Sequence, residues 1–218
     1  MNEFVKKLHQ QKVLPLFTPE DVDFAKKIIE QCAIFELSII ELTLRHPKAL
    51  HITEQLIHWA NTENLPVMIG AGTVIDEQTA TEAINAGVGF CVSPCIVPAV
   101  IHKVIEHHIP ILPGCFTPTE MLQAYQMGAS VLKIFPAQQF SPAIVKSVLA
   151  PLPFLPLMPS GGVTLEAANI GAWLHAGCIA VSMGSALIGE QALKNKQIAP
   201  IIANLQKLKD ILHENFNH

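Results

Sequence analysis

The sequence predicts an α/β protein, and more narrowly a (β/α)8 TIM barrel with an extra helix at its N-terminus. From residue 13 onward, short apolar runs alternate with amphipathic helical stretches, as in chains whose strands form a parallel sheet. Eight such units fit into 218 residues, an ordinary length for one barrel. A short amphipathic stretch, residues 1–10, precedes them. We expect residues 1–218 to form a single domain, because the alternative, a doubly wound open sheet, usually has fewer strands.

The first four expected units fill the first half of the chain, and a turn closes each apolar run. Pro19 opens the first helix, because proline is accepted in a first helical turn. Asp76 caps the third helix, Gly87 stops it, and Pro98 opens the fourth. The expected strands are residues 13–18, 38–44, 67–71 and 90–93, and the expected helices are residues 19–31, 48–61, 76–86 and 98–107.

The second half of the chain repeats the pattern with shorter elements. The fifth strand ends at Pro113-Gly114, and the sixth carries Lys133. The proline-rich stretch 150–159 is strongly apolar, which predicts a turn into a buried strand rather than a linker. The expected strands are residues 111–114, 130–136, 155–158 and 179–183, and the expected helices are residues 118–127, 142–149, 165–175 and 198–216.

Composition narrows the class of protein. The formal net charge is −4, from 14 lysines and arginines against 18 acidic residues, and the basic residues form no runs, so nucleic acid is not an expected partner. The five cysteines form no C-x-x-C pair, which is typical of core residues in a reducing compartment. No segment is apolar over enough residues to span a bilayer. We therefore expect a soluble cytoplasmic protein that does not contact membranes.

Lys133 stands alone in the apolar run 130–136. Burial disfavours the charged ammonium and lowers the pKa of the lysine toward the neutral amine, which attacks carbonyl groups. We therefore interpret Lys133 as a candidate Schiff-base nucleophile. The run alone leaves two alternatives open, a lysine that reaches solvent from a strand end and one half of a core ion pair.

The second strand ends with charged residues on one side. Alternation places Glu41, Thr43 and Arg45 on one face, and the apolar residues Ile40 and Leu42 on the other. In a parallel barrel the apolar set faces the helices, so the charged set must face the interior. The alternative is a structural ion pair at the barrel end.

The charged groups of these strand ends suit chemistry beside a carbonyl. Lys133 would condense with a ketone, and the planar guanidinium of Arg45 would hold an adjacent carboxylate through two hydrogen bonds. Glu41 would move protons. Thr73, at a glycine-flanked turn after the third strand, offers a hydroxyl to the same carboxylate.

Glycine-rich turns follow the seventh and eighth strands, at Ser160-Gly161-Gly162 and Gly184-Ser185. Barrels frequently bind phosphate at these strands, because such turns expose backbone N–H groups. A Gly-Gly pair by itself is more often only a turn. The histidines do not form a two-histidine, one-carboxylate set at the strand ends, so we expect no metal and no other cofactor.

Together these residues resemble a known family, the class I aldolases for 2-keto-3-deoxy-6-phosphogluconate (KDPG) and 4-hydroxy-2-oxoglutarate (KHG). The resemblance runs from about residue 13 to the C-terminus. The motifs that carry it are Glu41-Leu-Thr-Leu-Arg45, Gly70-Ala-Gly-Thr-Val74, Ser93-Pro94, Pro113-Gly114, Thr117-Pro118-Thr119-Glu120, Lys133-Ile-Phe-Pro136, Pro159-Ser-Gly-Gly162 and Gly184-Ser185.

The resemblance implies a lyase of carbohydrate metabolism, as in the Entner-Doudoroff pathway. Such an enzyme reversibly cleaves a 2-keto-4-hydroxy acid to pyruvate and either glyceraldehyde 3-phosphate or glyoxylate. It further implies a homotrimer that needs no metal. The roles it implies are a Schiff base on Lys133, acid/base work by Glu41, carboxylate binding by Arg45 and Thr73, packing beside the pyruvyl methyl by Pro94 and Phe135, and contact with the far end of the substrate by Ser160, Gly161, Gly162, Gly184 and Ser185.

Four departures from the family pattern concern turns and the aldehyde end. Phe35-Glu36 replaces a glycine pair before the second strand, and Cys95 replaces a glycine after Pro94. A basic residue that many relatives carry at the end of the first strand is missing around Phe17-Thr18, and Ser160 stands where threonine is usual. None of these touches the pyruvate half, so the reaction class is better defined than the aldehyde.

Alternatives to this interpretation remain. A close one is an aldolase for a related 2-keto-3-deoxy sugar acid phosphate, such as the galactonate epimer. A ketose-phosphate epimerase or isomerase would use Lys133 only electrostatically. A binding protein without catalysis on the same scaffold is the third, since a fold does not determine a function.

Overall fold

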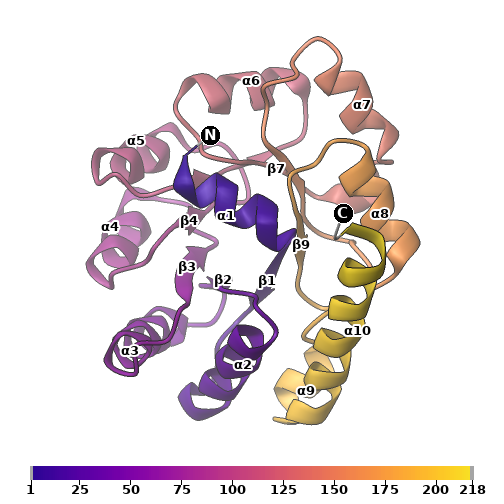
Figure 1. The fold of residues 1–218 in the computed structure, drawn as a ribbon. Helices are drawn as coiled ribbons and strands as arrows, with labels where there is room; N and C mark the ends of the chain where they lie inside the picture. The colour runs from indigo at the N-terminus through magenta and orange to yellow at the C-terminus, as the bar shows by residue number, and fades with distance from the viewer. Residues whose placement is uncertain (1, 217–218) are drawn as a thin grey trace.

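In the computed structural model, helices surround a curled parallel sheet, and nearly every strand is followed by a helix (Figure 1). The model describes residues 2–216, so Met1 and residues 217–218 of the expected domain lie outside it. The result is a TIM-barrel-like α/β fold, which confirms the predicted alternation. The strands are β1 (Val13–Phe17), β2 (Ile39–Thr43), β3 (Met68–Gly72), β4 (Cys91–Val92), β5 (Ile111–Leu112), β6 (Gly114–Cys115), β7 (Leu132–Ile134), β8 (Leu157–Pro159) and β9 (Val181–Met183).

The helices form the outer ring of Figure 1, apart from the first. They are α1 (Glu3–Gln11), α2 (Val22–Ile34), α3 (Ala49–Thr62), α4 (Glu77–Asn85), α5 (Pro98–Glu106), α6 (Pro118–Gln126), the 3-10 turn η1 (Ala137–Gln139), α7 (Ala143–Leu149), α8 (Ala167–His175), α9 (Glu190–Lys194) and α10 (Ile198–Phe216). Within the described range, every helix is too short or too polar to cross a bilayer.

The strands pair in parallel in two groups, in the orders β5-β4-β3-β2-β1-β9 and β6-β7-β8. Pro113 separates β5 from β6 within the expected fifth strand, because proline has no N–H to donate to a sheet. β5 pairs with β4, and β6 pairs with β7. On the other side, a single parallel bridge joins Ser160, just after β8, to Ser182 of β9.

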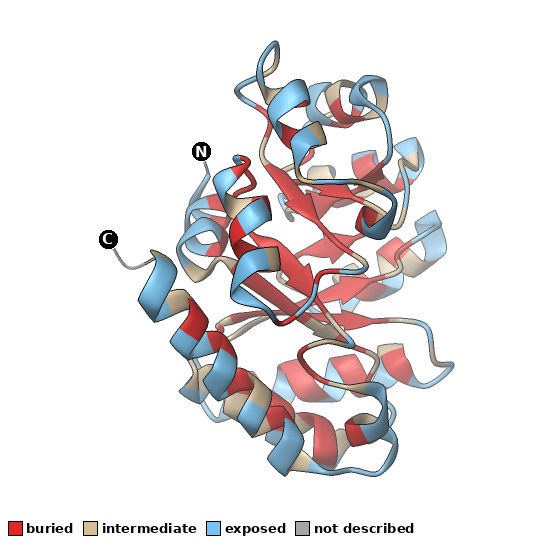
Figure 2. Ribbon diagram, turned by 90° about the vertical axis from the view of Figure 1, so that its right-hand side faces the viewer, coloured by how far each residue is buried: buried red, intermediate tan, exposed pale blue. Residues whose placement is uncertain are grey.

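The strands separate two apolar clusters. Ile40 and Leu42 pack in the cluster between the sheet and the outer helices, as alternation predicts, whereas Ile39 packs in the interior cluster. Figure 2 shows the strands buried over most of their length and the helices buried mainly on the faces that meet them. Glu41 lies two residues after Ile39 on β2, so its side chain points to the same face, into the interior.

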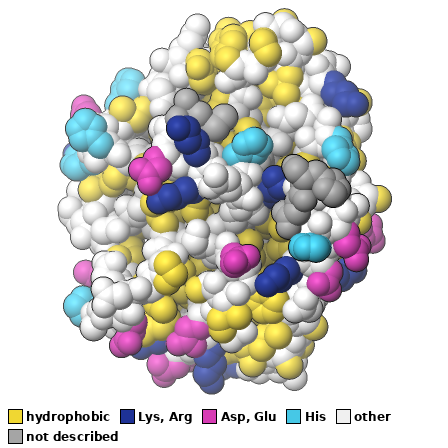
Figure 3. All heavy atoms as spheres, viewed as in Figure 1, with side chains coloured by type: hydrophobic (Ala, Val, Ile, Leu, Met, Phe, Trp, Pro, Cys, Tyr) yellow, Lys and Arg dark blue, Asp and Glu magenta, His cyan; other side chains and the backbone are white. Residues whose placement is uncertain are grey.

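Helix α1 crosses the middle of the ring in Figure 1, over one end of the strands. Its Phe4, Val5 and Leu8 belong to the interior cluster, and the Asn2 side chain caps its first turn by accepting a hydrogen bond from the N–H of Val5. Figure 3 shows this face, where lysine, acidic and histidine side chains are scattered among apolar ones. The catalytic end of such a sheet is the opposite one, at the carboxyl ends of the strands.

The boundaries differ from the predicted ones where a side chain selects the turn. Helix α2 begins at Val22 rather than at Pro19, because the Asp21 carboxylate caps it by accepting from the N–H of Phe24 at 2.8 Å. Strand β8 begins at Leu157 rather than at residue 155. The sequence pattern did not predict η1 or α9, since both are too short to show a helical period.

The turn before β2 shows how Phe35-Glu36 replaces the expected glycines. Phe35 ends α2, and Glu36 adopts the left-handed conformation that glycine favours, with φ of 64°. The turn is therefore built with a non-glycine residue in the left-handed conformation.

Candidate active site

Glu41 lies on β2, points into the interior and is 1% exposed. Its carboxylate lies directly against Gly72 of β3, where a Cβ atom would collide with it. One of its oxygens, Oε2, has no hydrogen-bond partner among the described residues. A buried oxygen without a partner is costly, so Glu41 is held at this position at the expense of stability.

Lys133 lies on β7 with the same inward direction and is 5% exposed. Its backbone N–H donates to the carbonyl of Pro113 at 3.0 Å, which sets the register of the strand where the proline divides β5 from β6. Its Nζ lies 4.7 Å from the centre of the Phe135 ring, two residues further along the same face. The predicted buried lysine is thus present, with an aromatic ring as its neighbour.

Burial shifts both ionisable groups toward their neutral forms. Burial raises the pKa of the Glu41 carboxyl above its ordinary value, although the charges of Lys133 and Arg45 act to lower it. Burial also lowers the pKa of the Lys133 amine, and Arg45 adds to this, while Glu41 opposes it. Glu41 and Lys133 therefore influence each other within one interior, and Arg45 acts on both from its rim.

Arg45, Thr73 and Pro94 lie at the rim of this interior. Arg45 follows β2 and is exposed. Thr73 follows β3 and is half-buried with φ of 67°, an outlier for a β-branched residue and a kind of strain that clusters at functional sites. The Pro94 carbonyl lies where a Cβ on Gly114 would stand, and Gly114 pairs with Lys133 across β6 and β7.

A cavity of about 360 Å³ opens at the carboxyl ends of β1, β2, β7, β8 and β9. Its lining does not include Lys133, Glu41, Thr73 or Pro94. Phe135 connects the two parts, since its ring contacts the lysine amine and also lines the cavity. The predicted residues that do line it are Arg45, Phe135, Ser160, Gly161, Gly162, Gly184 and Ser185.

Sequence reasoning missed two hydroxyl-bearing residues of this cavity, Thr18 and Ser182, and gave no role to a third, Thr43, which strand alternation had placed on the inward face. The Thr18 and Thr43 hydroxyls share a hydrogen bond of 2.6 Å. Ser182 is 2% exposed and its Oγ has no partner among the described residues. The polar Ser182 within the apolar run 179–183 could have indicated a site residue. Single serines are common in strands, however, so this pattern alone does not predict a function.

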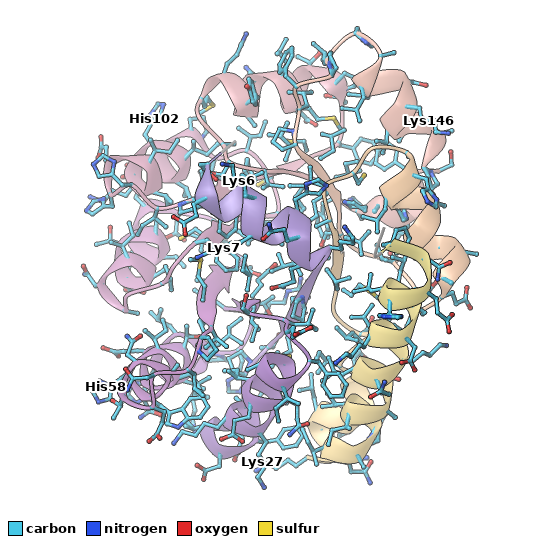
Figure 4. The ribbon with its side chains drawn as sticks, viewed as in Figure 1. Lys6, Lys7, Lys27, His58, His102 and Lys146 are labelled. Atoms are coloured by element: carbon cyan, nitrogen blue, oxygen red, sulfur yellow. The ribbon has the colours of Figure 1, made fainter. Side chains whose placement is uncertain are left out.

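The histidine and lysine side chains labelled in Figure 4 lie on helices. Lys27, His58, His102 and Lys146 lie on the outer helices, and Lys6 and Lys7 lie on α1. Within residues 2–216, no group of three or more histidine, cysteine or acidic side chains is arranged to hold a metal ion.

Comparison with known proteins places this geometry in context. A 2-dehydro-3-deoxy-phosphogluconate aldolase of Treponema pallidum is 28% identical over 94% of this chain and 95% of its own length. A 2-dehydro-3-deoxy-6-phosphogalactonate aldolase of Escherichia coli is 37% identical over 121 residues, which are 55% of this chain and 58% of that protein.

The fold agrees with these similarities. The structure of a KDPG aldolase from Legionella pneumophila, with pyruvate captured as a covalent carbinolamine, superposes with a TM-score of 0.80. It covers 98% of both chains at 24% identity, which shows a shared fold. The family model for KDPG and KHG aldolases matches residues 4–204. Because that match spans almost the whole sequence, the chain belongs to the KDPG and KHG aldolase family.

Proposed function

We propose that the protein is a class I pyruvate aldolase in which Lys133 forms a Schiff base with the ketone of a 2-keto-4-hydroxy acid. The observation that carries this proposal is the burial of Lys133 and Glu41 in one interior with their pKa values shifted in opposite directions. A lowered lysine pKa supplies the neutral amine for attack, and a raised carboxyl pKa supplies a proton donor. Family membership and the covalent pyruvate adduct of the Legionella relative support the same chemistry.

The proposed reaction uses only Lys133, Glu41 and one water molecule, which is lost and later added back. The neutral Lys133 amine attacks C2, and the resulting carbinolamine hydroxyl leaves as water with a proton from Glu41, giving the protonated imine. Glu41, now a carboxylate, takes the proton of the C4 hydroxyl. The C3–C4 bond then breaks, its electrons pass into the protonated imine to give a neutral enamine, and the aldehyde leaves. Glu41 returns its proton to C3, which restores the protonated imine, and addition of water to C2 releases pyruvate and the neutral lysine.

We propose that the remaining predicted residues hold the substrate around this centre. Arg45 and Thr73 would bind the carboxylate, with the strained backbone of Thr73 as support for a functional position. Pro94 and Phe135 would flank the pyruvyl methyl, with Phe135 beside the lysine amine. The far end of the substrate would meet the turns that line the cavity, Ser160, Gly161, Gly162, Gly184 and Ser185.

The proposed substrates are 2-dehydro-3-deoxy-6-phosphogluconate, cleaved to pyruvate and glyceraldehyde 3-phosphate, and 4-hydroxy-2-oxoglutarate, cleaved to pyruvate and glyoxylate. The similarity to the galactonate-type aldolase of Escherichia coli keeps the C4 epimer as the alternative. Arg45 is the one cation among the described residues of the cavity lining, and we assign it to the carboxylate. A phosphate would then depend on the backbone N–H groups of the glycine turns.

Trapping of the imine tests the reaction. The protein is incubated with pyruvate and borohydride, and the modified peptide is identified by intact mass and peptide mapping. The expected adduct lies on Lys133, is absent from Lys133→Ala, and is retained in Lys146→Ala, which alters an exposed lysine on α7. A folded protein that binds pyruvate without forming the adduct would overturn the aldolase proposal.

The finer architecture is also a proposal. We propose that residues 1–218 form one closed eight-stranded barrel, with β5 and β6 as one strand interrupted at Pro113 and α1 as the extra helix. The Ser160–Ser182 bridge and the packing of α1 on the interior cluster support this.

Assembly and location remain family-level proposals. A homotrimer agrees with the exposed apolar residues Phe116, Tyr125 and Phe154, and light scattering after gel filtration would measure its mass. Five free cysteines support a reducing compartment such as the cytoplasm.

A further inference from the structure

One wall of the cavity carries hydroxyl groups from adjacent strands. Ser160 follows β8, Ser182 lies on β9, Thr18 follows β1, and Thr43 ends β2, and these strands are neighbours in that order. All four residues line the cavity. We call this set the hydroxyl wall. It differs from the lysine end in having no ionisable group.

Within the hydroxyl wall, Ser182 is the member whose hydroxyl oxygen is both fully buried and without a partner among the described residues. The Thr18 and Thr43 hydroxyls already bind each other at 2.6 Å. Ser182 Oγ is buried, borders the cavity and has no partner among the described residues. A buried hydroxyl without a partner is costly, so native structures retain one mainly where a ligand or a water completes its hydrogen bonds.

Ser182 also occupies the right place along a bound substrate. Across the β8–β9 bridge it adjoins Ser160, the residue at the start of the Gly161-Gly162 turn, and β8 in turn pairs with the strand of Lys133. A substrate attached at Lys133 and extending toward the glycine turns would bring its aldehyde fragment to the side of the cavity that Ser182 lines.

We propose that Ser182 is a specificity-determining residue that hydrogen-bonds the hydroxyl on the carbon next to the reacting aldehyde carbon. The substrate class is then the 2-keto-3-deoxy sugar acids, whose aldehyde fragment is a 2-hydroxyaldehyde. An aldehyde with only hydrogen atoms on that carbon would leave Ser182 Oγ without a partner in the complex. Sites built to bind a hydroxyl reject analogues that lack it for this reason. This inference rests on the aldolase function proposed above.

The test measures aldol addition of pyruvate to three aldehydes, of which the first two are matched in size. Glyceraldehyde carries the 2-hydroxyl, 3-hydroxypropanal lacks only that group, and glyoxylate carries a carboxylate in its place. Each is assayed with the wild-type protein, with Ser182→Ala, with Ser182→Cys as a variant of similar volume, and with Ser147→Ala. Ser147 is an exposed serine of α7 and is the matched control. Glyceraldehyde 3-phosphate is assayed in parallel.

We expect Ser182→Ala to lower kcat/KM about tenfold for glyceraldehyde and for its 3-phosphate, and to change it less than about twofold for 3-hydroxypropanal. Ser182→Cys should resemble Ser182→Ala, because a thiol is a weak donor. The free Ser182→Ala protein should also unfold at a higher temperature, since a purely structural hydroxyl would lower that temperature when removed.

Two results would overturn the inference. One is a loss that is equal for all aldehydes, and the other is no loss for glyceraldehyde. Pyruvate trapping on Lys133 is measured in the same samples. Absence of the adduct from the wild-type protein would show that the aldolase proposal itself fails, whereas an adduct with no dependence on the 2-hydroxyl rejects the role of Ser182 alone.

Discussion

The two ends of the site are built by opposite means. The lysine end consists of charged groups inside strands, with Glu41 packed against Gly72 and Lys133 beside Phe135. The hydroxyl wall consists of neutral groups at strand ends around an open cavity. Both ends nonetheless contain a buried oxygen without a partner, Glu41 Oε2 and Ser182 Oγ. Packing thus fixes the chemistry at one end, while the other end leaves room for the part of the substrate that varies.

The largest expected effect comes from Glu41→Gln, which leaves the shape of the lysine end and removes its proton transfer. Because one positioned acid/base contributes roughly 10²–10⁴-fold, kcat should fall by about that factor for every aldehyde. Steady-state kinetics with glyceraldehyde and glyoxylate measure the change. A fall in kcat that differs between the two aldehydes would show that Glu41 contacts the aldehyde fragment. It would contradict the assignment of catalysis to one end of the site and of aldehyde selection to the other.

The pH dependence of activity, set by Glu41 and Lys133, also distinguishes the lysine end from the hydroxyl wall. Activity should rise with pH as Lys133, whose pKa is lowered from 10.5, loses its proton, and should fall as Glu41, whose pKa is raised from 4.5, loses its own. A bell-shaped profile of kcat/KM follows, with apparent pKa values that belong to the pair. Glu41→Gln should abolish one limb, whereas Ser182→Ala should lower the profile without moving it.

Stability should respond to pH through the same carboxyl. The folded state retains the Glu41 proton in a window above 4.5 where the unfolded chain has lost it, so the contribution of Glu41 to stability falls as pH rises through that window. Glu41→Gln removes this dependence. The melting temperature of Glu41→Gln, relative to that of the wild type, should therefore increase as pH rises from about 4.5 toward neutrality. Thermal unfolding at a series of pH values measures this difference.

Two glycines offer a smaller, structural test. At Gly72 a Cβ would meet the Glu41 carboxylate, so Gly72→Ala should destabilise the protein by about 1–3 kcal/mol and displace Glu41. At Gly171 in α8 the nearest atoms are 3.6 Å away, an ordinary contact, so Gly171→Ala should stabilise by up to about 1 kcal/mol. Denaturant unfolding compares them, and a tolerated Gly72→Ala with full activity would contradict the tight packing at the lysine end.

The same contrast explains what the sequence could predict. Glu41 and Lys133 interrupt apolar runs, and strand parity alone directs them to one interior, so their proximity was predictable before any coordinates. Ser182 interrupts a run too, but a hydroxyl costs little in a strand, and its importance depends on which neighbours fail to bind it. That information belongs to the tertiary structure. Likewise Asp21, rather than Pro19, begins α2 because a specific hydrogen bond decides between two plausible starts.

The smallest predicted effect lies outside both ends, in the turn that leads from α2 into β2. Glu36 has φ of 64°, where a Cβ atom costs roughly 1–2 kcal/mol, and glycine avoids that cost while adding about 0.4–1 kcal/mol of unfolded-state entropy.

Glu36→Gly should therefore stabilise the protein by about 0.5–1 kcal/mol, measured by denaturant unfolding. In the exposed interior of α3, Glu54→Gly should instead destabilise by a similar amount, because glycine weakens a helix. Kinetics of Glu36→Gly should match the wild type with every aldehyde. If activity fell while stability rose, the strained turn would be part of what positions Glu41, and the lysine end would extend back to the start of β2.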